Sequence, residues 1–433
     1  MIIDGDDGAH DRPTRSCASY MKGCRDGVNN ASSSVGVVAA LGTFALSGCQ
    51  MVEGLLNPDR SEEIRALQFS VTAPRDAWPM DDYDNGAEEK LWKVPVGDGL
   101  PASLCAVQDD IAVVGFNVGA ETDGGGVRLI DIRSNKEVRS FKGMSCTANS
   151  GIVDGKAFVF SYQSQEAQFA TLDVKSGELV SYKLPGKPKL SAVTGVGIKR
   201  GSVIVVADFA ASTFVVSMRD NNVQWEDTLA TTTPNCLLVK KYVGCTTESE
   251  GVAFDVETGR KVVEAKVGTS SRDHVWASDG YYSYPGGPGE RFDGKPVNIE
   301  GKATRLYYPS DRQGATVPLA ELDQGFNNSH SFVINREGKV VAHTHDGDWR
   351  ETQTGETIDG VNGLSGPRAA TCSGKTFVLQ ETGARNSFFW SVGKGRIFEM
   401  PGVTDSAINQ LDGYLVIDDY TEDGTQIVLP KGK

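Results

Sequence analysis

An all-β fold is predicted for residues 90–433 by three observations: short apolar runs, dense turn formers and an internal repeat. The apolar runs are about five residues long and are bounded by Gly, Asp, Asn or Ser, which is typical of buried strands joined by turns. Glycine supplies 50 of the 433 residues and adopts the left-handed backbone conformation that tight turns need. The runs lie at residues 111–115, 157–161, 203–207, 339–343, 376–380 and 414–418.

The internal repeat is a strand, a turn and a second strand. The copies at residues 129–138, 171–180 and 253–262 align without a gap. Asp131, Asp173 and Asp255 end the first strand, Ser or Thr follows three residues later, and Gly or Asn comes next. The Asp side chain can accept bonds from the turn backbone, and Gly or Asn tolerates a positive φ. The spacings of 42 and 82 residues predict a degenerate copy between the second and third, near residues 215–225.

A period of about 40 to 50 residues with four strands is typical of one blade of a β-propeller. Residues 90–433 then form a single propeller of eight blades, with seven as the alternative. The last blade would combine residues 406–429 with one strand from residues 91–96, so that the N- and C-terminal strands pair and close the ring. The other blades are expected at residues 103–143, 147–187, 191–231, 235–268, 273–320, 330–362 and 366–402.

The repeat resembles that of the quinoprotein-like (PQQ-like) propellers over most of residues 90–433. That family includes a non-enzymatic lipoprotein scaffold, so the resemblance implies the propeller fold and permits a scaffold role. Two features depart from it. Val138, Val180 and Val262 stand where the family's motif continues towards a docking tryptophan, and the chain has no adjacent cysteine pair of the kind that flanks the quinone. We therefore predict the fold without a cofactor.

Residues 35–49 read as a secretory signal that ends in a lipobox. An apolar run leads to Leu46-Ser-Gly-Cys49, which resembles the bacterial lipoprotein consensus in which the cysteine receives the lipid. The run is shorter than the roughly 20 residues that a membrane-spanning helix needs. Residues 1–48 are then a leader, with Met21 as an alternative start because residues 1–20 are rich in Asp, and residues 49–89 are a flexible acidic tether. The predicted location is extracytoplasmic, with the chain anchored to the lipid bilayer through Cys49.

Disulfides can persist outside the cytoplasm. Five cysteines follow the lipobox: Cys105, Cys146, Cys236, Cys245 and Cys372. A hairpin through Lys240 and Lys241 would place Cys236 opposite Cys245 and predicts a disulfide there, and Cys105 with Cys146 is the weaker candidate. The alternative is that all five are small buried apolar residues. Because five is odd, one of them should be free or should pair with another chain.

A metal site is considered at His343 and His345. Residues two apart on a strand face the same way, so both imidazoles could bind one metal, and His330 lies in the same predicted blade. The alternative is a solvated strand end that runs into a turn. The acidic run at residues 81–84 fits an EF-hand calcium loop poorly, because Tyr83 occupies a ligand position.

The predicted function is that of a cell-envelope lipoprotein whose propeller binds or scaffolds another envelope or membrane protein. Asp and Glu outnumber Lys and Arg by 57 to 43, which disfavours a nucleic-acid partner. No catalytic residue can be assigned, since the chain lacks GxSxG and HExxH motifs. The alternative is an envelope enzyme, or a receptor for a ligand or metal, that uses the central channel, and the sequence leaves that question open. An exposed aromatic patch would support the protein-binding function. The candidates for such a patch are Trp276, Tyr281, Tyr282 and Tyr284, and the alternative is that their rings pack inside a blade.

Overall fold

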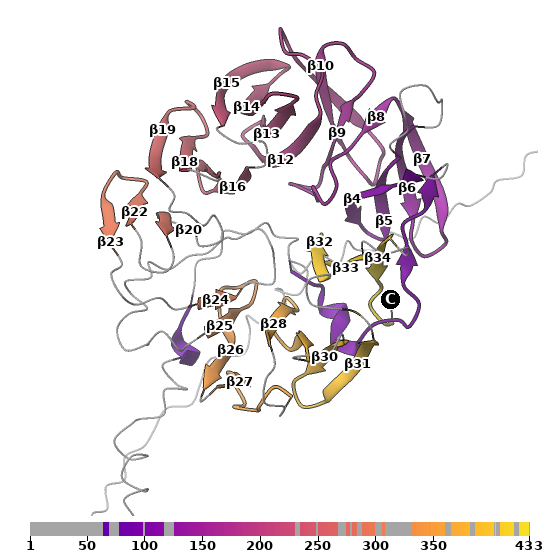
Figure 1. Ribbon diagram of the computed structural model, residues 1–433, viewed down its shortest axis with the longest axis vertical. Helices are drawn as coiled ribbons and strands as arrows, with labels where there is room; N and C mark the ends of the chain where they lie inside the picture. Colours follow the sequence, from indigo (N-terminus) through magenta and orange to yellow (C-terminus); the bar gives the residue numbers. More distant parts are fainter. Residues whose placement is uncertain are drawn as a thin grey trace, which may run out of the picture.

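The structure is a computed structural model in which β-sheets follow one another around a common axis (Figure 1). It describes residues 64–68, 78–97, 100–116, 125–229, 234–247, 250–266, 274–277, 279–283, 288–298, 305–307, 331–345, 347–359, 365–381, 386–401, 403, 408–419 and 424–432. Within these ranges no helix is long and apolar enough to cross a membrane. The leader, Cys49 and most of the predicted tether lie outside the described residues.

Eight four-stranded sheets are found in the described part of the chain, and we number them in chain order. Sheet 1 consists of β4 (Ser103–Gln108), β5 (Ile111–Phe116), β6 (Gly126–Asp131) and β7 (Lys136–Lys142). Sheet 2 consists of β8 (Met144–Ser145), β9 (Ala157–Ser161), β10 (Ala167–Leu172) and β11 (Leu179–Leu184). Sheet 3 consists of β12 (Ala192–Lys199), β13 (Ser202–Phe209), β14 (Ser212–Arg219) and β15 (Asn222–Leu229). Sheet 4 consists of β16 (Asn235–Val239), β17 (Tyr242–Thr246), β18 (Glu250–Asp255) and β19 (Lys261–Lys266).

The remaining four sheets follow the same order. Sheet 5 consists of β20 (His274–Ala277), β21 (Gly280–Ser283), β22 (Pro288–Arg291) and β23 (Pro296–Asn298). Sheet 6 consists of β24 (Arg305–Tyr307), β25 (Ser331–Ile334), β26 (Val340–His345) and β27 (Asp348–Glu351). Sheet 7 consists of β28 (Ser365–Ala370), β29 (Thr376–Gln380), β30 (Asn386–Ser391) and β31 (Gly395–Pro401). Sheet 8 consists of β32 (Ile408–Leu411), β33 (Tyr414–Asp419), β34 (Gly424–Val428) and β1 (Trp92–Lys93).

The all-β class is confirmed, and the sheets have the arrangement of a β-propeller. Sheets 1 to 4 and sheet 7 lie within a few residues of the expected blade limits. In sheet 8, Trp92 pairs with Ile427 and Lys93 with Gln426, so the first strand joins the last sheet. Two short elements lie outside the eight sheets: the ribbon of β2 (Val96–Gly97) with β3 (Leu100–Pro101), and the 3-10 helix η2 (Asp81–Asn85).

Sheet 6 differs from the prediction. Its first strand, β24, comes from the region assigned to the preceding blade and pairs in parallel with β25, where an antiparallel neighbour was expected. A parallel neighbour cannot be reached through a tight turn, so no turn signal in the sequence marks it. The preceding sheet correspondingly ends at Asn298 rather than near residue 320.

Burial explains why the central strands are apolar runs. Side chains along β5, β13 and β30 are almost all buried, whereas β7 at the outer edge of sheet 1 is exposed along nearly its whole length. In sheets 3 and 4, Figure 1 shows the first strand nearest the centre and the fourth at the rim. A central strand packs on both faces against neighbouring sheets, so both of its faces must be apolar.

Clusters of buried apolar side chains join neighbouring sheets. One such cluster joins sheets 8 and 1 through Tyr414, Ile427, Val107 and Val114. Others join sheets 1 and 2, 2 and 3, 3 and 4, 4 and 5, 6 and 7, and 7 and 8. The core is therefore a set of interfaces between sheets. Each sheet packs against the sheets that precede and follow it in the chain.

The described part of the predicted tether is packed against the sheets, which corrects the expectation of a flexible segment. Trp78, Tyr83 and Ala87 are 1%, 0% and 3% exposed. Ile64 is also buried, and Gln68 forms a β-bridge with Lys339. We call residues 64–68 and 78–90 the strap.

Candidate interaction face

The two ends of each sheet carry different connections between strands. Antiparallel strands reverse at alternate ends, so the turns that join the first to the second strand and the third to the fourth share one end. We call this end the turn face, and the opposite end the loop face. The turn face carries residues 109–110, 131–136, 154–155, 173–178, 200–201, 220–221, 240–241, 255–260, 292–295, 371–376, 391–395 and 412–413. In sheet 6, where β24 is an added parallel strand, the turn face carries residues 335–339, between β25 and β26, and residues 351–356, after β27, which lie beside the turns of sheet 7.

The repeated turns have the geometry that their residues predict. Asp131 Oδ1 accepts from Ser134 N at 2.7 Å, and Asp173 Oδ1 accepts from Ser176 N at 2.8 Å. Asp255 Oδ1 likewise accepts from the backbone N–H of Thr258 at 3.1 Å. The next residues, Asn135, Gly177 and Gly259, have φ of 54°, 68° and 69°. The side chain caps the turn while a residue that tolerates the left-handed conformation reverses the chain.

A further copy of this turn, which the sequence did not predict, lies at Glu351. Glu351 Oε2 accepts from Thr354 N at 2.6 Å, and Gly355 has φ of 72°. Glu replaces Asp there, so the repeat, which ends its first strand on Asp, does not predict this copy. The degenerate copy expected near residues 215–225 is instead a two-residue turn at Asp220 and Asn221, with φ of 49° and 60°.

Side chains from the outer strand of one sheet dock on the turn of the next. Trp225 of sheet 3 donates from Nε1 to Val256 O at 2.8 Å, and its ring lies over Gly259. Arg139 of sheet 1 donates to Gly177 O of sheet 2 at 3.0 Å. Trp92 of sheet 8 donates to Asn135 Oδ1 of sheet 1 at 3.1 Å. We call these contacts the inter-sheet locks.

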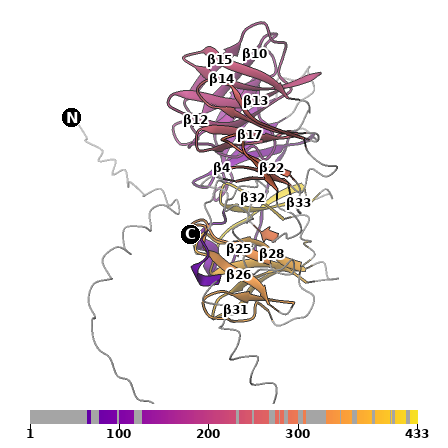
Figure 2. The ribbon, with the colours of Figure 1, turned by 90° about the vertical axis from the view of Figure 1, so that its left-hand side faces the viewer.

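The strap lies across the turn face of sheets 6, 7, 8 and 1. Arg65 donates to Thr352 O at 3.1 Å in sheet 6, and Ser373 N of sheet 7 donates to Asp81 Oδ1 at 2.8 Å. Met80 N donates to Gly413 O of sheet 8 at 3.1 Å, and Glu88 pairs with Arg133 of sheet 1 at 2.6 Å. In Figure 2 the strap, drawn in indigo, lies on the left-hand side of the disc.

Two strap residues place polar groups inside the protein. Tyr83 donates from its hydroxyl to Val428 O at 2.5 Å and accepts from Leu415 N at 3.1 Å, and burial raises its pKa. Asp84 accepts from Thr376 Oγ1 at 2.6 Å and from Thr371 Oγ1 at 3.1 Å. Burial also raises the pKa of Asp84, and the hydrogen bond from Thr376 opposes that rise. These contacts are structural, and no calcium-like ligand arrangement is formed by the described acidic side chains.

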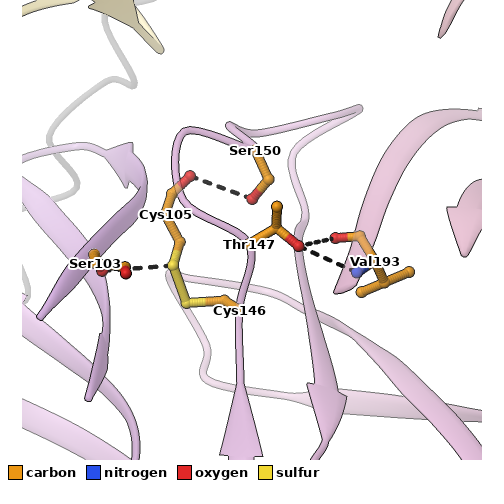
Figure 3. The surroundings of a disulfide bond; sticks show 6 residues. All are labelled: Ser103, Cys105, Cys146, Thr147, Ser150 and Val193. Atoms are coloured by element: carbon orange, nitrogen blue, oxygen red, sulfur yellow. Dashed lines mark hydrogen bonds between the residues drawn. A yellow bond between two sulfur atoms is a disulfide. The ribbon is translucent and has the colours of Figure 1, made fainter. Parts of the chain in front are cut away.

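A disulfide holds the first two sheets together at their inner strands (Figure 3). Cys105 of β4 is bonded to Cys146, which directly follows β8, with the α-carbons 6.0 Å apart. Ser150 donates to Cys105 O at 3.3 Å, and Thr147 Oγ1 donates to Val193 O at 2.7 Å. The segment after β8 is thereby tied to sheets 1 and 3.

The same inner segment reaches sheet 8. Asp412 accepts from Val107 N at 2.9 Å and from Ile152 N at 2.6 Å. Asp418 accepts from the side-chain amides of Asn409 at 2.7 Å and Asn149 at 3.3 Å. These polar groups therefore satisfy one another across the junction of sheets 8, 1 and 2.

The second expected disulfide is also present. Cys236 of β16 lies directly opposite Cys245 of β17, with the α-carbons 4.1 Å apart. Cys372 is disulfide-bonded as well, to a partner outside the described residues. The odd count predicted that one of the five cysteines is free or bonded to another chain. Cys372 is the fifth cysteine, and it is not free.

The histidine candidates are only partly described. His343 is buried, at 7% exposure, and its Nδ1 lies 3.4 Å from Thr352 Oγ1. The side chain of His345 and all of His330 lie outside the described residues. Among the described side chains no group of three metal-ligating residues is found.

The aromatic candidates are divided in the same way. Trp276 and Tyr281 are buried, at 2% and 0% exposure, and their ring centroids are 4.8 Å apart. These two therefore pack inside the protein, as the alternative interpretation expected. The side chain of Tyr282 and all of Tyr284 lie outside the described residues.

The fold defines the class as an all-β protein with the sheet arrangement of a β-propeller. No protein-family model matches the chain, and no curated protein matches it. The β-propeller domain of Cps50 (Swd1) from Myceliophteria thermophila is similar at 9% identity with a TM-score of 0.36, over 79% of this chain and 100% of that one. The WD40 domain of SCAP from fission yeast is similar at 11% identity with a TM-score of 0.37, over 79% of this chain and 98% of that one. AztD from Citrobacter koseri has 15% identity and a TM-score of 0.32, over 48% of this chain and 63% of that one. Similarity at this level says nothing about ligand or partner.

Proposed function

We propose that the chain is a cell-envelope lipoprotein whose eight sheets form a closed, eight-bladed propeller that binds another envelope or membrane protein. The observation that carries the location is the pair of disulfides, Cys105–Cys146 and Cys236–Cys245. Structural disulfides persist in oxidising compartments and are rare in the cytoplasm. They support the same location as the secretory signal and lipobox at residues 35–49.

Three contacts support closure of the ring. β1 pairs with β34, Trp92 docks on the turn of sheet 1, and Arg133 of that turn binds Glu88 of the strap. Each contact joins residues near the start of the propeller to its last or first sheet. Such a junction replaces an open interface with a packed one.

Binding is favoured over catalysis by the groups around the inner strands. The carboxylates of Asp412 and Asp418 accept from backbone and amide groups of neighbouring sheets, which is a structural use. A closed propeller places loops from several sheets on one rigid face, and loops on a rigid scaffold commonly carry recognition.

Lipidation is tested by expressing the full chain in a bacterial host that is fed a labelled fatty acid. We expect the wild type to carry label and to float with membranes, and Cys49→Ser to lose both. Cys24→Ser is the matched control, because that cysteine lies in the leader and should leave the label unchanged. Unreduced peptide mapping completes the test: Cys49 joined to another cysteine, with no lipid on it, would rule out the anchor.

The partner is tested by cross-linking the lipidated protein in its native membrane and identifying what purifies with it. We expect one reproducible envelope protein that is enriched over the Cys49→Ser sample. Recovery of no partner, together with turnover of a small substrate by the pure protein, would overturn the binding function in favour of an enzyme.

A further inference from the structure

We propose that the Cys236–Cys245 disulfide is a reversible redox site, at which a thiol reductant attacks the sulfur of Cys236, and that breaking this bond frees the first strand of sheet 4. The Cys105–Cys146 disulfide is structural and does not take part. This inference goes beyond the proposed function, because it depends neither on the anchor at Cys49 nor on the protein partner.

The first step is access to the disulfides. In thiol–disulfide exchange a thiolate must reach one of the two sulfurs, so exposed disulfides are the labile ones. Cys105 and Cys146 are 1% and 6% exposed, and Cys245 is 0% exposed. Cys236, on β16, is only half-buried. Of the two disulfides between described cysteines, only Cys236–Cys245 can therefore be reached from solvent, and it is reached at Cys236.

The second step is how much of the fold depends on each bond. Cys236–Cys245 closes 9 residues of a hairpin. Five facing pairs, from Asn235 with Thr246 to Val239 with Tyr242, already hold that hairpin together. Cys105–Cys146 instead joins sheet 1 to the segment that follows the first strand of sheet 2, across 41 residues. Reduction of the hairpin bond leaves the strand pairing in place, so the protein stays folded and the bond can form again.

The reaction moves two electrons from the reductant to the disulfide. A thiolate attacks Cys236 Sγ, the bond between the two protein sulfurs breaks, and Cys245 leaves as a thiolate that takes up the proton lost by the reductant. A monothiol stops at a mixed disulfide on Cys236. A dithiol goes on, because its second thiolate attacks its own bound sulfur. That step releases Cys236, which is protonated in turn, and leaves the reductant as a disulfide.

The two strands that the bond joins are held differently. β17 pairs with β16 on one side and with β18 on the other. Trp276 of sheet 5 also lies over Gly244 of β17 and donates from Nε1 to Thr246 Oγ1 at 2.9 Å. β16 lies nearest the centre in Figure 1, and among the described strands it pairs with β17 alone. Loss of the bond therefore leaves Cys245 in place and lets the end of β16 at Asn235 and Cys236 separate from β17.

Timed reduction of the native, oxidised full chain tests the difference in access. The protein is treated with dithiothreitol, the reaction is stopped with acid, and free thiols are alkylated in denaturant and quantified by peptide mass spectrometry. We expect Cys236 and Cys245 to be freed at least about tenfold faster than Cys105 and Cys146. Equal rates would overturn the proposal. Reduction of Cys236–Cys245 only in urea would overturn it as well, because the bond would then open through unfolding.

The attacked sulfur is identified with reduced glutathione, a monothiol. We expect the glutathione adduct on Cys236 and not on Cys245. Two matched variants separate the thiols: Cys245→Ser keeps Cys236, and Cys236→Ser keeps Cys245. In the native variants iodoacetamide should modify Cys236 at least about tenfold faster than Cys245. If urea denaturation shows that either variant is unfolded, the position of the glutathione adduct on wild type decides. An adduct on Cys245, or equal reactivity of the two thiols, would contradict the proposal.

Hydrogen–deuterium exchange tests the release of β16. The oxidised chain is compared with the chain treated with dithiothreitol just long enough to open Cys236–Cys245 and leave Cys105–Cys146 intact. Peptides that cover β16 should exchange at least about threefold faster after reduction, while those of β17 and of β13 in sheet 3 should not change. Reoxidation should restore the slow exchange. Unchanged exchange in β16, or faster exchange in β13 and β17 as well, would show that the bond does not control this strand.

Discussion

Asp84 is a single residue of the strap that makes the stability of the protein depend on pH. Its carboxylate lies among the hydroxyls of Thr371 and Thr376, and burial raises its pKa above the ordinary value of 3.8 for an Asp side chain. The folded state then binds more protons than the unfolded state as the pH rises from 3.8 to the folded pKa. Stability contributed by this group therefore falls with rising pH across that window.

We expect Asp84→Asn to remove that fall. Relative to wild type, the free energy of unfolding of the variant should rise between pH 4 and pH 7. Urea denaturation at the two pH values measures it, with Asp82→Asn in the same 3-10 helix as the control. A difference between variant and wild type that stays constant with pH would contradict the assignment.

The pKa of Asp173 is shifted in the opposite direction to that of Asp84. Its hydrogen bond from Lys156 is the main reason that its pKa is lowered from 3.8 to about 2. The stability that it contributes is present above pH 3.8 and is lost as the pH falls from 3.8 towards 2. Because the pair is partly exposed to solvent, its contribution should be below about 1 kcal/mol.

Lys156→Met should therefore flatten the loss of stability on acidification. The free energy of unfolding of wild type should exceed that of the variant at pH 7, and the two should converge near pH 2. Lys175→Met, an exposed neighbour on the same turn, is the control. Convergence in the control as well would point to net charge instead of the Lys156–Asp173 pair.

At the scale of the element, the inter-sheet locks explain why one turn glycine matters more than another. Gly259 and Gly355 occupy the same position of the turn, with φ of 69° and 72°. A Cβ at Gly259 would lie 2.5 Å from the Trp225 ring, whereas a Cβ at Gly355 meets nothing within 4 Å. A side chain at either position would strain the backbone, because φ is positive at both. Only at Gly259 would it also clash with the Trp225 ring.

Gly355→Ala should cost about 1 to 2 kcal/mol, the price of the left-handed conformation for a residue with a Cβ. Gly259→Ala should cost about 1 to 3 kcal/mol more, because the indole must move and its bond to Val256 is weakened. Urea denaturation of both variants measures the difference. Equal losses would show that Trp225 does not lock sheet 3 to sheet 4.

The two disulfides differ in the length of chain that they close. Cys105–Cys146 spans 41 residues and Cys236–Cys245 spans 9. The chain-entropy model then predicts a loss of about 4 kcal/mol for the double alanine variant of the first bond and about 2.5 kcal/mol for that of the second. Thermal and urea denaturation of the two double variants test the order, and a reversed order would show that local packing outweighs loop closure.

At the scale of the whole molecule, Tyr83 connects the strap to the closing sheet. Its hydroxyl satisfies a carbonyl of β34 and an N–H of β33, both inside the protein. Tyr83→Phe would leave these two groups without that partner, at a cost of about 1 to 3 kcal/mol. We expect the free energy of unfolding to fall by that amount and protease cleavage within the strap to accelerate. Tyr242→Phe is the control, since the Tyr242 side chain is only half-buried. Unchanged stability and cleavage would show that the strap is held by its other contacts.

A feature of the fold could be predicted from the sequence when the residues that form it lie close together in the chain. The repeat turns at Asp131, Asp173 and Asp255 were readable because cap and left-handed residue lie within four positions of each other. The hairpin that aligns Cys236 with Cys245 was readable for the same reason. The strap was not, because its residues have the charge and turn composition of a linker while their partners lie far away in the chain.

The sequence by itself determined the repeating turns, most of the strands and the approximate limits of all sheets but the fifth and sixth. Each of these depends on the alternation of apolar and turn-forming residues over a few positions. Only the tertiary structure decided that Arg65 meets Thr352, that β24 joins sheet 6 in parallel, and that Trp225 docks on Gly259. Such contacts join residues from tens to hundreds of positions apart, and they exist only once packing of the sheets has excluded water and brought those surfaces together.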